Sequence, residues 1–330
     1  MRAAIVEGFG PIESHRMGEL PDPRPGPGQV VVTVRATAVN FVDLLIVTGK
    51  YQFLPPRPFV PGKLPVGVVS EIGSGVAHLK RGDRVLTLAE QGGYAEKVCV
   101  EETQCFKLPA SMSFIAAAAM ALVYDTSWFA LRERGRLAPG ETVLVLGSTG
   151  GVGLASIQLA KALGARVLAG VSGPDKASLA RDAGADDIID LSKDNLKDSL
   201  REQVYAKNSG RGADVVIDPV GGDAFDAAIR AIAWRGRLVV VGFAAGRIPT
   251  VKVNYLLLKN IEVSGIQVSD YRKRTPDLMA KCIDEIFTLF EAGKLKPSST
   301  ATYPLAQFAQ AMQDVANRRV RGRIVLVQDP

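Results

Sequence analysis

The stretch between residues 143 and 171 constrains the fold more than any other part of the chain. An apolar run at 143–146 is followed by a glycine-rich turn at 147–153. A helical pattern then continues to a stop at Gly164, and a second apolar run occupies 167–171. This order predicts strand, turn, helix and strand, which together make one βαβ unit.

The glycine-rich turn has a composition that suits an anion. Gly150 and Gly151 allow a tight turn that approaches a phosphate, and Gly153 allows the helix to pack closely on the sheet. Ser148 occupies the first position of the usual G-x-G-x-x-G pattern, so the pattern is incomplete. A phosphate-binding P-loop is the alternative, but no Gly-Lys-Ser/Thr follows. We therefore expect a dinucleotide pyrophosphate at the start of the helix.

Length and charge limit the classes of protein that fit. A chain of 330 residues predicts two domains. The net charge of +6 is spread along the sequence, which makes nucleic acid an unlikely partner. Short basic clusters at 272–274 and 318–323 are interpreted as solvated surface.

Cysteine usage and the apolar segments indicate a cytoplasmic protein that does not enter a membrane. Cys99, Cys105 and Cys282 lack the paired spacing of a disulfide framework or a zinc cluster. The N-terminus has no signal-peptide pattern. The longest apolar run, at 114–123, is too short to cross a bilayer.

Residues 1 to about 120 read as mostly β-structure, with proline- and glycine-rich loops between the strands. Short strands at this spacing predict a small barrel or sandwich. Ser111 is expected to cap a helix through the alanines at 116–119, and a second helix is expected at 126–134. The predicted strands lie at 30–39, 67–73 and 83–88.

From residue 141 strands and helices alternate, which predicts a doubly wound parallel sheet of six strands. A last strand at 323–327 is expected to return to the first domain. The predicted strands lie at 143–146, 167–171, 188–189, 214–218, 237–241 and 261–266. The predicted helices after the first lie at 174–182, 196–207, 224–233, 277–291 and 306–317.

With these motifs in order, the whole chain resembles a known family. It is similar to the zinc-free medium-chain dehydrogenase/reductases of the NADPH:quinone oxidoreductase (zeta-crystallin-like) family. The resemblance implies an α/β protein with a GroES-like β-barrel catalytic domain, residues 1–121 and 296–330, and a Rossmann dinucleotide-binding domain, residues 122–295. The motifs are Val39-Asn40-Phe41-Val42-Asp43, Gly49-Lys50-Tyr51, Gly67-Val68-Val69, Gly82-Asp83-Arg84-Val85, Gly92-Gly93-Tyr94-Ala95-Glu96, the 147–153 turn and Asp218-Pro219-Val220-Gly221-Gly222.

The residues argue against a metal. Alcohol dehydrogenases of the same superfamily have cysteine where this chain has Asn40 and histidine where it has Lys63. Their structural zinc needs four clustered cysteines, which the segment 85–115 does not supply. The two histidines, His15 and His78, are interpreted as surface residues. We predict no metal site.

The end of the second strand predicts NADPH as the cofactor. An NAD site places a carboxylate there, whereas Ser172 and Lys176 offer a hydroxyl and a cation to a 2′-phosphate. The alternative is that Lys176 is only an exposed residue of a helix. The resemblance adds Arg318 as a third phosphate contact. Leu191 replaces a tyrosine of many relatives, and the preceding Asp190 would repel a phosphate.

The resemblance also implies which residues meet the acceptor and the rest of the cofactor. Asn40, Asp43 and Tyr51 are the predicted catalytic residues. Without zinc, donors must stabilise a developing oxyanion, and Tyr51 and Asn40 can donate. Asp43 is expected to orient Tyr51 or its loop. The alternative is that Asn40 and Asp43 only close a loop by side-chain-to-backbone bonds. The predicted cofactor-binding residues are Thr126, Ser148, Thr149, Gly150, Gly151, Val152, Ser172, Lys176, Val220, Gly242, Phe243, Ala244, Ile266 and Arg318.

Two departures from the family pattern bear on the acceptor. Val47 stands where many relatives have arginine, and Leu64 where they often have glutamate. Both changes predict a less charged cleft, which favours apolar acceptors such as quinones or α,β-unsaturated carbonyls.

We therefore predict an NADPH-dependent oxidoreductase that transfers a hydride to a quinone. An enoyl or 2-alkenal reductase is the second enzyme hypothesis. A crystallin-like structural or RNA-associated protein is the hypothesis of a different class, and the scattered charge argues against its RNA form. The strand at 262–266 is expected to be a sheet edge through which two copies form a homodimer.

Overall fold

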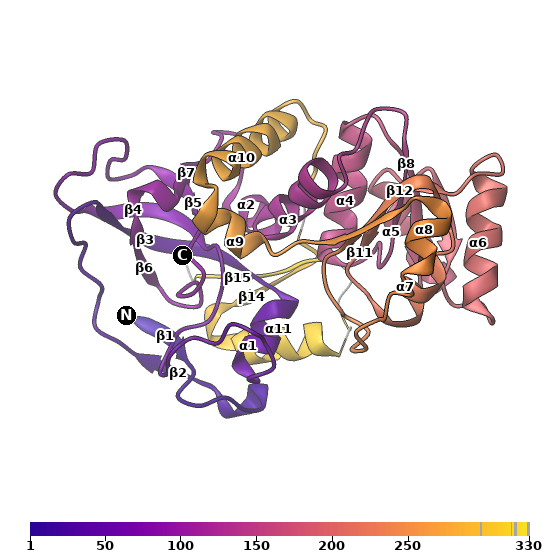
Figure 1. The fold of residues 1–330 in the computed structure, drawn as a ribbon. Helices are drawn as coiled ribbons and strands as arrows, with labels where there is room; N and C mark the ends of the chain where they lie inside the picture. The colour runs from indigo at the N-terminus through magenta and orange to yellow at the C-terminus, as the bar shows by residue number, and fades with distance from the viewer. Residues whose placement is uncertain (298, 318, 320–321, 329–330) are drawn as a thin grey trace. The chain divides into compact units, whose positions relative to one another are not determined.

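The computed structural model describes residues 1–297, 299–317, 319 and 322–328. The chain divides into two compact units, Met1–Leu122 with Pro297–Pro330, and Val123–Lys296. Figure 1 labels their elements. Each unit has its own main sheet and its own core.

The first unit is built around one long strand, β3 (Gln29–Val39). Its valine-rich sequence suits a buried pleated strand, and the five valines of the segment are almost completely buried. A seven-stranded sheet runs in the order β14-β15-β3-β4-β5-β7, with β6 also on β3. The other strands of this sheet are β4 (Val66–Ile72), β5 (Arg84–Thr87), β6 (Lys97–Glu101), β7 (Cys105–Lys107), β14 (Ala301–Pro304) and β15 (Ile324–Val327). β1 (Arg2–Ile5) and β2 (Arg16–Glu19) pair with each other in a separate two-stranded sheet.

The last strand of the chain belongs to this first sheet. β15 pairs antiparallel with β3, so that Ile324 lies opposite Val39. β14, which the sequence pattern does not reveal, pairs with β15 in parallel. The C-terminal strand therefore places residue 323 beside the end of β3, where α1 (Phe41–Val47) begins.

The helices of the first unit show where prediction of caps fails. The N-cap of α2 (Phe114–Met120) is Ser113, not Ser111, because the Ser113 hydroxyl accepts from the Ala116 amide at 3.1 Å. α1 was not predicted. The remaining helices are α11 (Phe308–Ala316) and the 3-10 helices η1 (Ile12–Ser14), η2 (Glu102–Gln104) and η5 (Leu305–Gln307).

The second unit confirms the predicted doubly wound sheet. Its six strands are all parallel, in the order β10-β9-β8-β11-β12-β13. The order reverses between β8 and β11, and in such sheets ligands bind at the C-terminal ends of the strands at that point. The strands are β8 (Thr142–Val145), β9 (Arg166–Val171), β10 (Asp187–Asp190), β11 (Ala213–Asp218), β12 (Ile232–Val240) and β13 (Glu262–Gly265).

Helices cover both faces of this sheet (Figure 1). α4 (Gly151–Ala162) lies on one face, and α6 (Leu196–Lys207), α7 (Gly222–Ala228) and α8 (Asn254–Lys259) pack into the core on the other. The others are α3 (Val123–Trp128), the π-helix η3 (Phe129–Arg134), the 3-10 helix η4 (Pro174–Lys176), α5 (Ala177–Asp182), α9 (Val268–Arg274) and α10 (Pro276–Glu291).

Two predicted helices of this unit have wrong bounds. The helix predicted at 126–134 begins at Val123, and its second half is a π-helix. The helix predicted at 224–233 ends at Ala228, because Ile232 pairs with Ala213 and so begins β12. At 224–233, strand pairing outweighs the helix propensity of the alanines.

The apolar segment predicted at 114–123 does not form one continuous helix. α2 ends at Met120 and α3 starts at Val123. Within the described ranges no single helix is long and apolar enough to span a bilayer, and α2 meets that criterion only when it is joined to the helical stretch 123–134.

Candidate functional site

The glycine-rich turn lies between β8 and α4, at the predicted ligand-binding end of the sheet. Gly147 has a φ of +58°, a conformation that favours glycine. Ser148 is fully buried and donates its hydroxyl to the Val145 carbonyl at 2.7 Å. The serine that breaks the usual glycine pattern therefore satisfies its polar group inside the turn.

Gly150 and Gly153 have different structural requirements. A Cβ on Gly153 would lie 2.3 Å from the Gly147 oxygen and 2.6 Å from the Ser148 Cα, so only glycine fits. A Cβ on Gly150, the N-cap of α4, would have its nearest neighbour at 3.5 Å. The first amides of a helix have no intrahelical acceptor and attract anions. The turn therefore has a structural glycine at 153 and a glycine at 150 that the protein alone does not require.

A second turn from β11 packs against the first. The Val220 side chain lies 2.8 Å from the position of a Cβ on Gly147. The buried Asp218 carboxylate accepts from the amides of Val220 and Gly221, at 2.8 and 2.9 Å, and its burial raises its pKa. At the end of β12, the Ala244 amide donates to the Pro219 carbonyl at 3.1 Å. The predicted residues Val220, Gly242, Phe243 and Ala244 thus lie on two adjoining turns of one sheet edge.

The structure brings together the two residues predicted to bind a 2′-phosphate. Lys176 Nζ donates to the Ser172 hydroxyl at 2.9 Å. Asp190 accepts from the hydroxyl and amide of Ser192, and the hydroxyl bond is the main reason that its pKa is lowered. Leu191 packs beside Gly170, with Cδ1 3.1 Å from the position of a Cβ there. Arg318, the third predicted contact, lies outside the described residues.

In the first unit, Asn40 and Asp43 form a buried network with two residues that were not predicted. Asp43 Oδ2 accepts from the Asn40 backbone amide at 2.9 Å, from Asn40 Nδ2 at 3.2 Å and from the Tyr94 hydroxyl at 3.0 Å. Arg323 donates to Asn40 Oδ1 at 3.0 Å. Arg323 also donates to the carbonyls of Ala119 and Ala121, both at 3.2 Å.

This network caps helix α1, and it also changes the pKa values of two of its members. Asn40 is the N-cap of α1 and Asp43 closes over it, so the proposed structural role of the pair is present. Burial raises the pKa of Asp43, and Asp43 Oδ1 has no hydrogen-bond partner among the described residues. Burial and the neighbouring Asp43 carboxylate raise the pKa of Tyr94 well above its ordinary value. Tyr94 is therefore a neutral donor, and Asp43 orients Tyr94 and Asn40.

A buried ion pair lies close to this network. Lys63 is 6% exposed, and its ammonium contacts the carboxylate of Glu90, which is 27% exposed. The positive charge of Lys63 acts on Asp43, where it partly opposes the effect of burial on the pKa. Val47 and Leu64 are both fully buried, so they belong to the core. Lys63 and Glu90 add two charges near Asp43 that the expectation of a less charged cleft did not consider.

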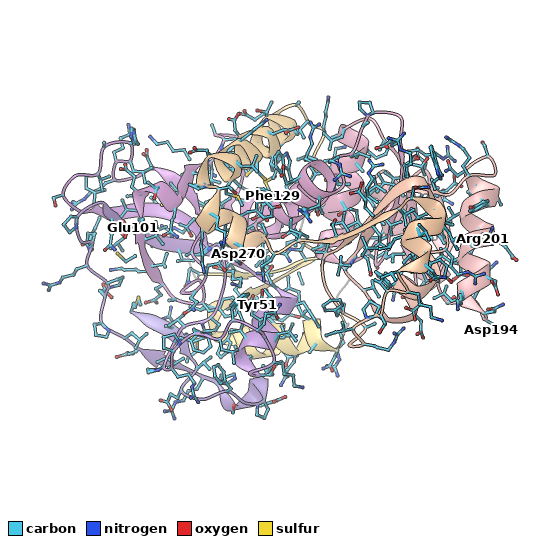
Figure 2. All side chains as sticks on the ribbon, in the orientation of Figure 1. Tyr51, Glu101, Phe129, Asp194, Arg201 and Asp270 are labelled. Atoms are coloured by element: carbon cyan, nitrogen blue, oxygen red, sulfur yellow. The ribbon has the colours of Figure 1, made fainter. Side chains whose placement is uncertain are left out.

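The structure also places the other predicted residues. Tyr51 lies next to α1 (Figure 2). Its ring packs edge-on against Phe53, with ring centroids 6.2 Å apart. Tyr51 is not among the hydrogen-bond partners of Asp43. Of the two expected roles of Asp43, the structure shows the second, in which it orients the loop at the start of α1. Thr126 is buried in α3 and its amide donates to Asp125 Oδ1 at 2.8 Å. The Ile266 amide continues the sheet by donating to the Val240 carbonyl at 3.0 Å.

The two histidines differ in their surroundings. His78 is exposed, as predicted. His15 is 6% exposed, and its burial lowers its pKa, so the interpretation of His15 as a surface residue is wrong. In the part of the chain that the structure describes, no group of three or more histidine, cysteine, aspartate or glutamate side chains could hold a metal ion.

Sequence reasoning missed Tyr94, Glu90 and Arg323 as members of the site. Tyr94 was visible in the motif at 92–96, but nothing in the sequence connected it to Asp43. Arg323 was assigned to a solvated basic cluster, and this assignment is wrong because its side chain is 8% exposed and hydrogen-bonded. The useful signal was its position just before the last strand, which pairs with β3.

Both units match the sequence models of known dehydrogenase families. Residues 26–110 match the alcohol dehydrogenase GroES-like domain, and residues 151–285 match the zinc-binding dehydrogenase family. The chain is 40% identical over 304 residues to a quinone oxidoreductase-like protein 2 homolog from Nematostella vectensis, covering 91% of this chain and 82% of the relative.

Two solved structures have the same fold over nearly the whole chain. The Escherichia coli quinone oxidoreductase complexed with NADPH is 29% identical, with a TM-score of 0.89 over 99% of this chain and 100% of the other. A mycobacterial protein complexed with NADPH is 31% identical, with a TM-score of 0.91 over 99% of both chains.

Proposed function

The chain belongs to the NADPH:quinone oxidoreductase family of medium-chain dehydrogenases/reductases, and from this premise we propose that it reduces quinones with NADPH and without a metal. The bound cofactor would supply the hydride. The protein would supply binding, orientation and donors for the acceptor oxygen. The oxidoreductase class follows from the family, and the acceptor and the metal independence are our proposal.

The proposal of NADPH as the cofactor rests on one contact in the structure. Ser172 and Lys176 meet at the C-terminal end of β9, where an NAD site has a carboxylate. A hydroxyl and an ammonium there can hold a 2′-phosphate by charge-assisted hydrogen bonds. The diphosphate would bind the amides at Gly151 and Val152, where α4 begins. The Asp190 carboxylate accepts from Ser192, which lowers its pKa and keeps it negatively charged, so Asp190 opposes the phosphate while Lys176 favours it.

The residue types of the first unit support chemistry without zinc. Asn40 and Lys63 occupy the positions of two zinc ligands in the alcohol dehydrogenases that share this superfamily. An amide and an ammonium are not the thiolate, imidazole or carboxylate that zinc binds in proteins. The Tyr51 hydroxyl is proposed to meet the acceptor oxygen. Asn40 is a positioning residue instead, because both N–H groups of its side-chain amide already donate, to the Ala38 carbonyl and to Asp43 Oδ2.

The function is tested by NADPH oxidation in the presence of a small acceptor panel. We expect turnover with 1,4-benzoquinone and 9,10-phenanthrenequinone that exceeds turnover with crotonyl-CoA or an alkenal, and that persists after treatment with a strong chelator. Faster turnover of the activated C=C compounds would replace the quinone proposal with the enoyl or alkenal reductase. No turnover together with salt-sensitive RNA binding would favour a structural or RNA-associated protein instead.

Replacement of Lys176 by alanine should remove most of the preference for NADPH. A hydrogen bond to a charged group contributes about 1.5–3 kcal/mol, which is roughly a 10- to 150-fold change in Kd. We expect the Kd for NADPH, measured by calorimetry, to rise by about this factor while the Kd for NADH stays the same. Lys281→Ala, an exposed lysine on α10 of the same unit, is the matched control. Equal Kd values for NADPH and NADH in the wild type would contradict the assignment.

We also propose a homodimer through β13. This strand is the edge of the six-stranded sheet, and unpaired edges bind other strands. The segment before it exposes three large apolar side chains, Val253, Leu257 and Leu258, each more than 70% exposed. Light scattering should give twice the chain mass, and Leu257→Glu with Leu258→Glu should give a monomer. A monomeric wild type at micromolar concentration would contradict this proposal.

A further inference from the structure

Lys63 and Glu90 form an ion pair whose ammonium is buried and whose carboxylate is partly exposed. Burial of an ammonium is costly unless it is paired and hydrogen-bonded. Lys63 Nζ contacts only Glu90 among the described residues, through the carboxylate and, at 3.4 Å, the backbone carbonyl. An ammonium has three N–H donors, so one remains for another acceptor. Asp43 Oδ1, in the adjacent network, likewise lacks a partner among the described residues.

The backbone holds Lys63 in a fixed position. Gly62 before it has a φ of +95°, and Leu64 after it has a φ of +52°, which is unusual for a residue with a side chain. Hydrogen bonds hold both sides of the segment: the Leu64 amide donates to Ala89, and the Tyr94 amide donates to Pro61. A Cβ on Gly62 would lie 2.3 Å from the Tyr94 ring. Strained backbone that is held this firmly is concentrated at functional sites.

Glu90 connects this buried ammonium to solvent. Its side chain is 27% exposed, whereas that of Lys63 is 6% exposed. A carboxylate in this position can neutralise the ammonium, and it can also accept a proton from solvent and pass it inward. Lys63 is thus a fixed cation with an open N–H, next to the buried Asn40–Asp43–Tyr94 network and supplied with protons from one side.

We propose that Lys63 is a catalytic residue that binds the acceptor oxygen and protonates it, with Glu90 as its source of protons. This inference rests on the proposed reductase function and adds the proton that the function leaves unassigned. As a hydride reaches the acceptor, negative charge forms on its oxygen. An O–H bond then forms as an Nζ–H bond breaks, which leaves a neutral amine. A solvent proton taken up by Glu90 and passed to Nζ restores the ion pair.

The binding part of this proposal can be tested without turnover. 4-Nitrophenol serves as the probe, because its phenolate is yellow and resembles a developing oxyanion. We expect the pKa of the bound phenol to be lower in the wild type than in Lys63→Met by about one unit, a tenfold change in ionisation. Lys80→Met, an exposed lysine of the same unit, should match the wild type. An equal phenol pKa in the wild type and Lys63→Met would overturn the proposal.

The proton-transfer part is tested by Lys63→Arg, which also covers the case in which Lys63→Met does not fold. A guanidinium keeps the charge but does not release a proton in proteins. We expect Lys63→Arg to keep the lowered phenol pKa and to lose at least about 100-fold in kcat with quinone. Undiminished kcat would overturn the proposal. The NADPH Kd should be unchanged in both Lys63 variants, and absence of turnover in the wild type would instead count against the proposed function.

Discussion

Replacement of Gly153 by alanine is expected to lower the free energy of unfolding by about 3 kcal/mol, the upper part of the range for overpacking. The added Cβ would lie 2.3 Å from the Gly147 oxygen and 2.7 Å from the Ser148 carbonyl carbon. Both are backbone atoms of the turn that joins β8 to α4, so they cannot move without displacing the helix. Urea unfolding followed by circular dichroism measures the change.

Gly150→Ala is the matched control, and it separates folding from binding. The new Cβ would have its nearest neighbour at 3.5 Å, and Gly150 has an ordinary φ of −81°. We expect a stability change within about 1 kcal/mol, the usual effect at an N-cap. NADPH affinity should fall at least about tenfold, because the backbone can no longer approach the pyrophosphate. Equal stability loss in both variants, or full NADPH affinity in Gly150→Ala, would contradict this account of the turn.

Replacement of Arg323 by methionine is expected to destabilise the protein by about 3–4 kcal/mol. The side chain is 8% exposed and donates to Asn40 Oδ1 and to the carbonyls of Ala119 and Ala121. Each buried acceptor left without its donor costs about 1–3 kcal/mol, reduced by any relaxation. Methionine keeps most of the length of the side chain and removes the donors together with the positive charge.

The neighbouring arginine provides the control for this second prediction. Arg319 is 67% exposed and pairs with Asp314 at 3.7 Å. Surface substitutions of this kind usually change stability by no more than about 0.5 kcal/mol. Denaturant midpoints of Arg323→Met and Arg319→Met should therefore differ widely. Equal midpoints would show that the buried guanidinium does not hold α2, β3 and the C-terminal strand together.

The second unit could be predicted well because its signals are local. Strands that are buried on both faces appear as apolar runs, and β8, β9 and β11 end within two residues of the predicted positions. The turn between β8 and α4 could also be predicted, because Gly153 occupies a position where only glycine fits. Helix caps were less certain: Ser111 and Ser113 both suit an N-cap, and only the fold selects Ser113.

The site in the first unit could be predicted only in part, because its contacts join distant residues. Asn40 and Arg323 are 283 positions apart, and Tyr94 reaches Asp43 across 51 positions. The sequence of the basic cluster at 318–323 does not show that the side chain of Arg323 is buried. Lys63 was noticed only as a residue that is not histidine, since the sequence does not show that Glu90 lies beside it.

Calorimetric titration of the wild-type protein with NADPH and with NADH tests the central claim most directly. The claim is that the amides at the start of α4 bind the diphosphate and that Ser172 and Lys176 bind the additional phosphate. The account predicts heat with NADPH and a Kd at least about tenfold lower than that for NADH. No heat with either coenzyme would contradict it.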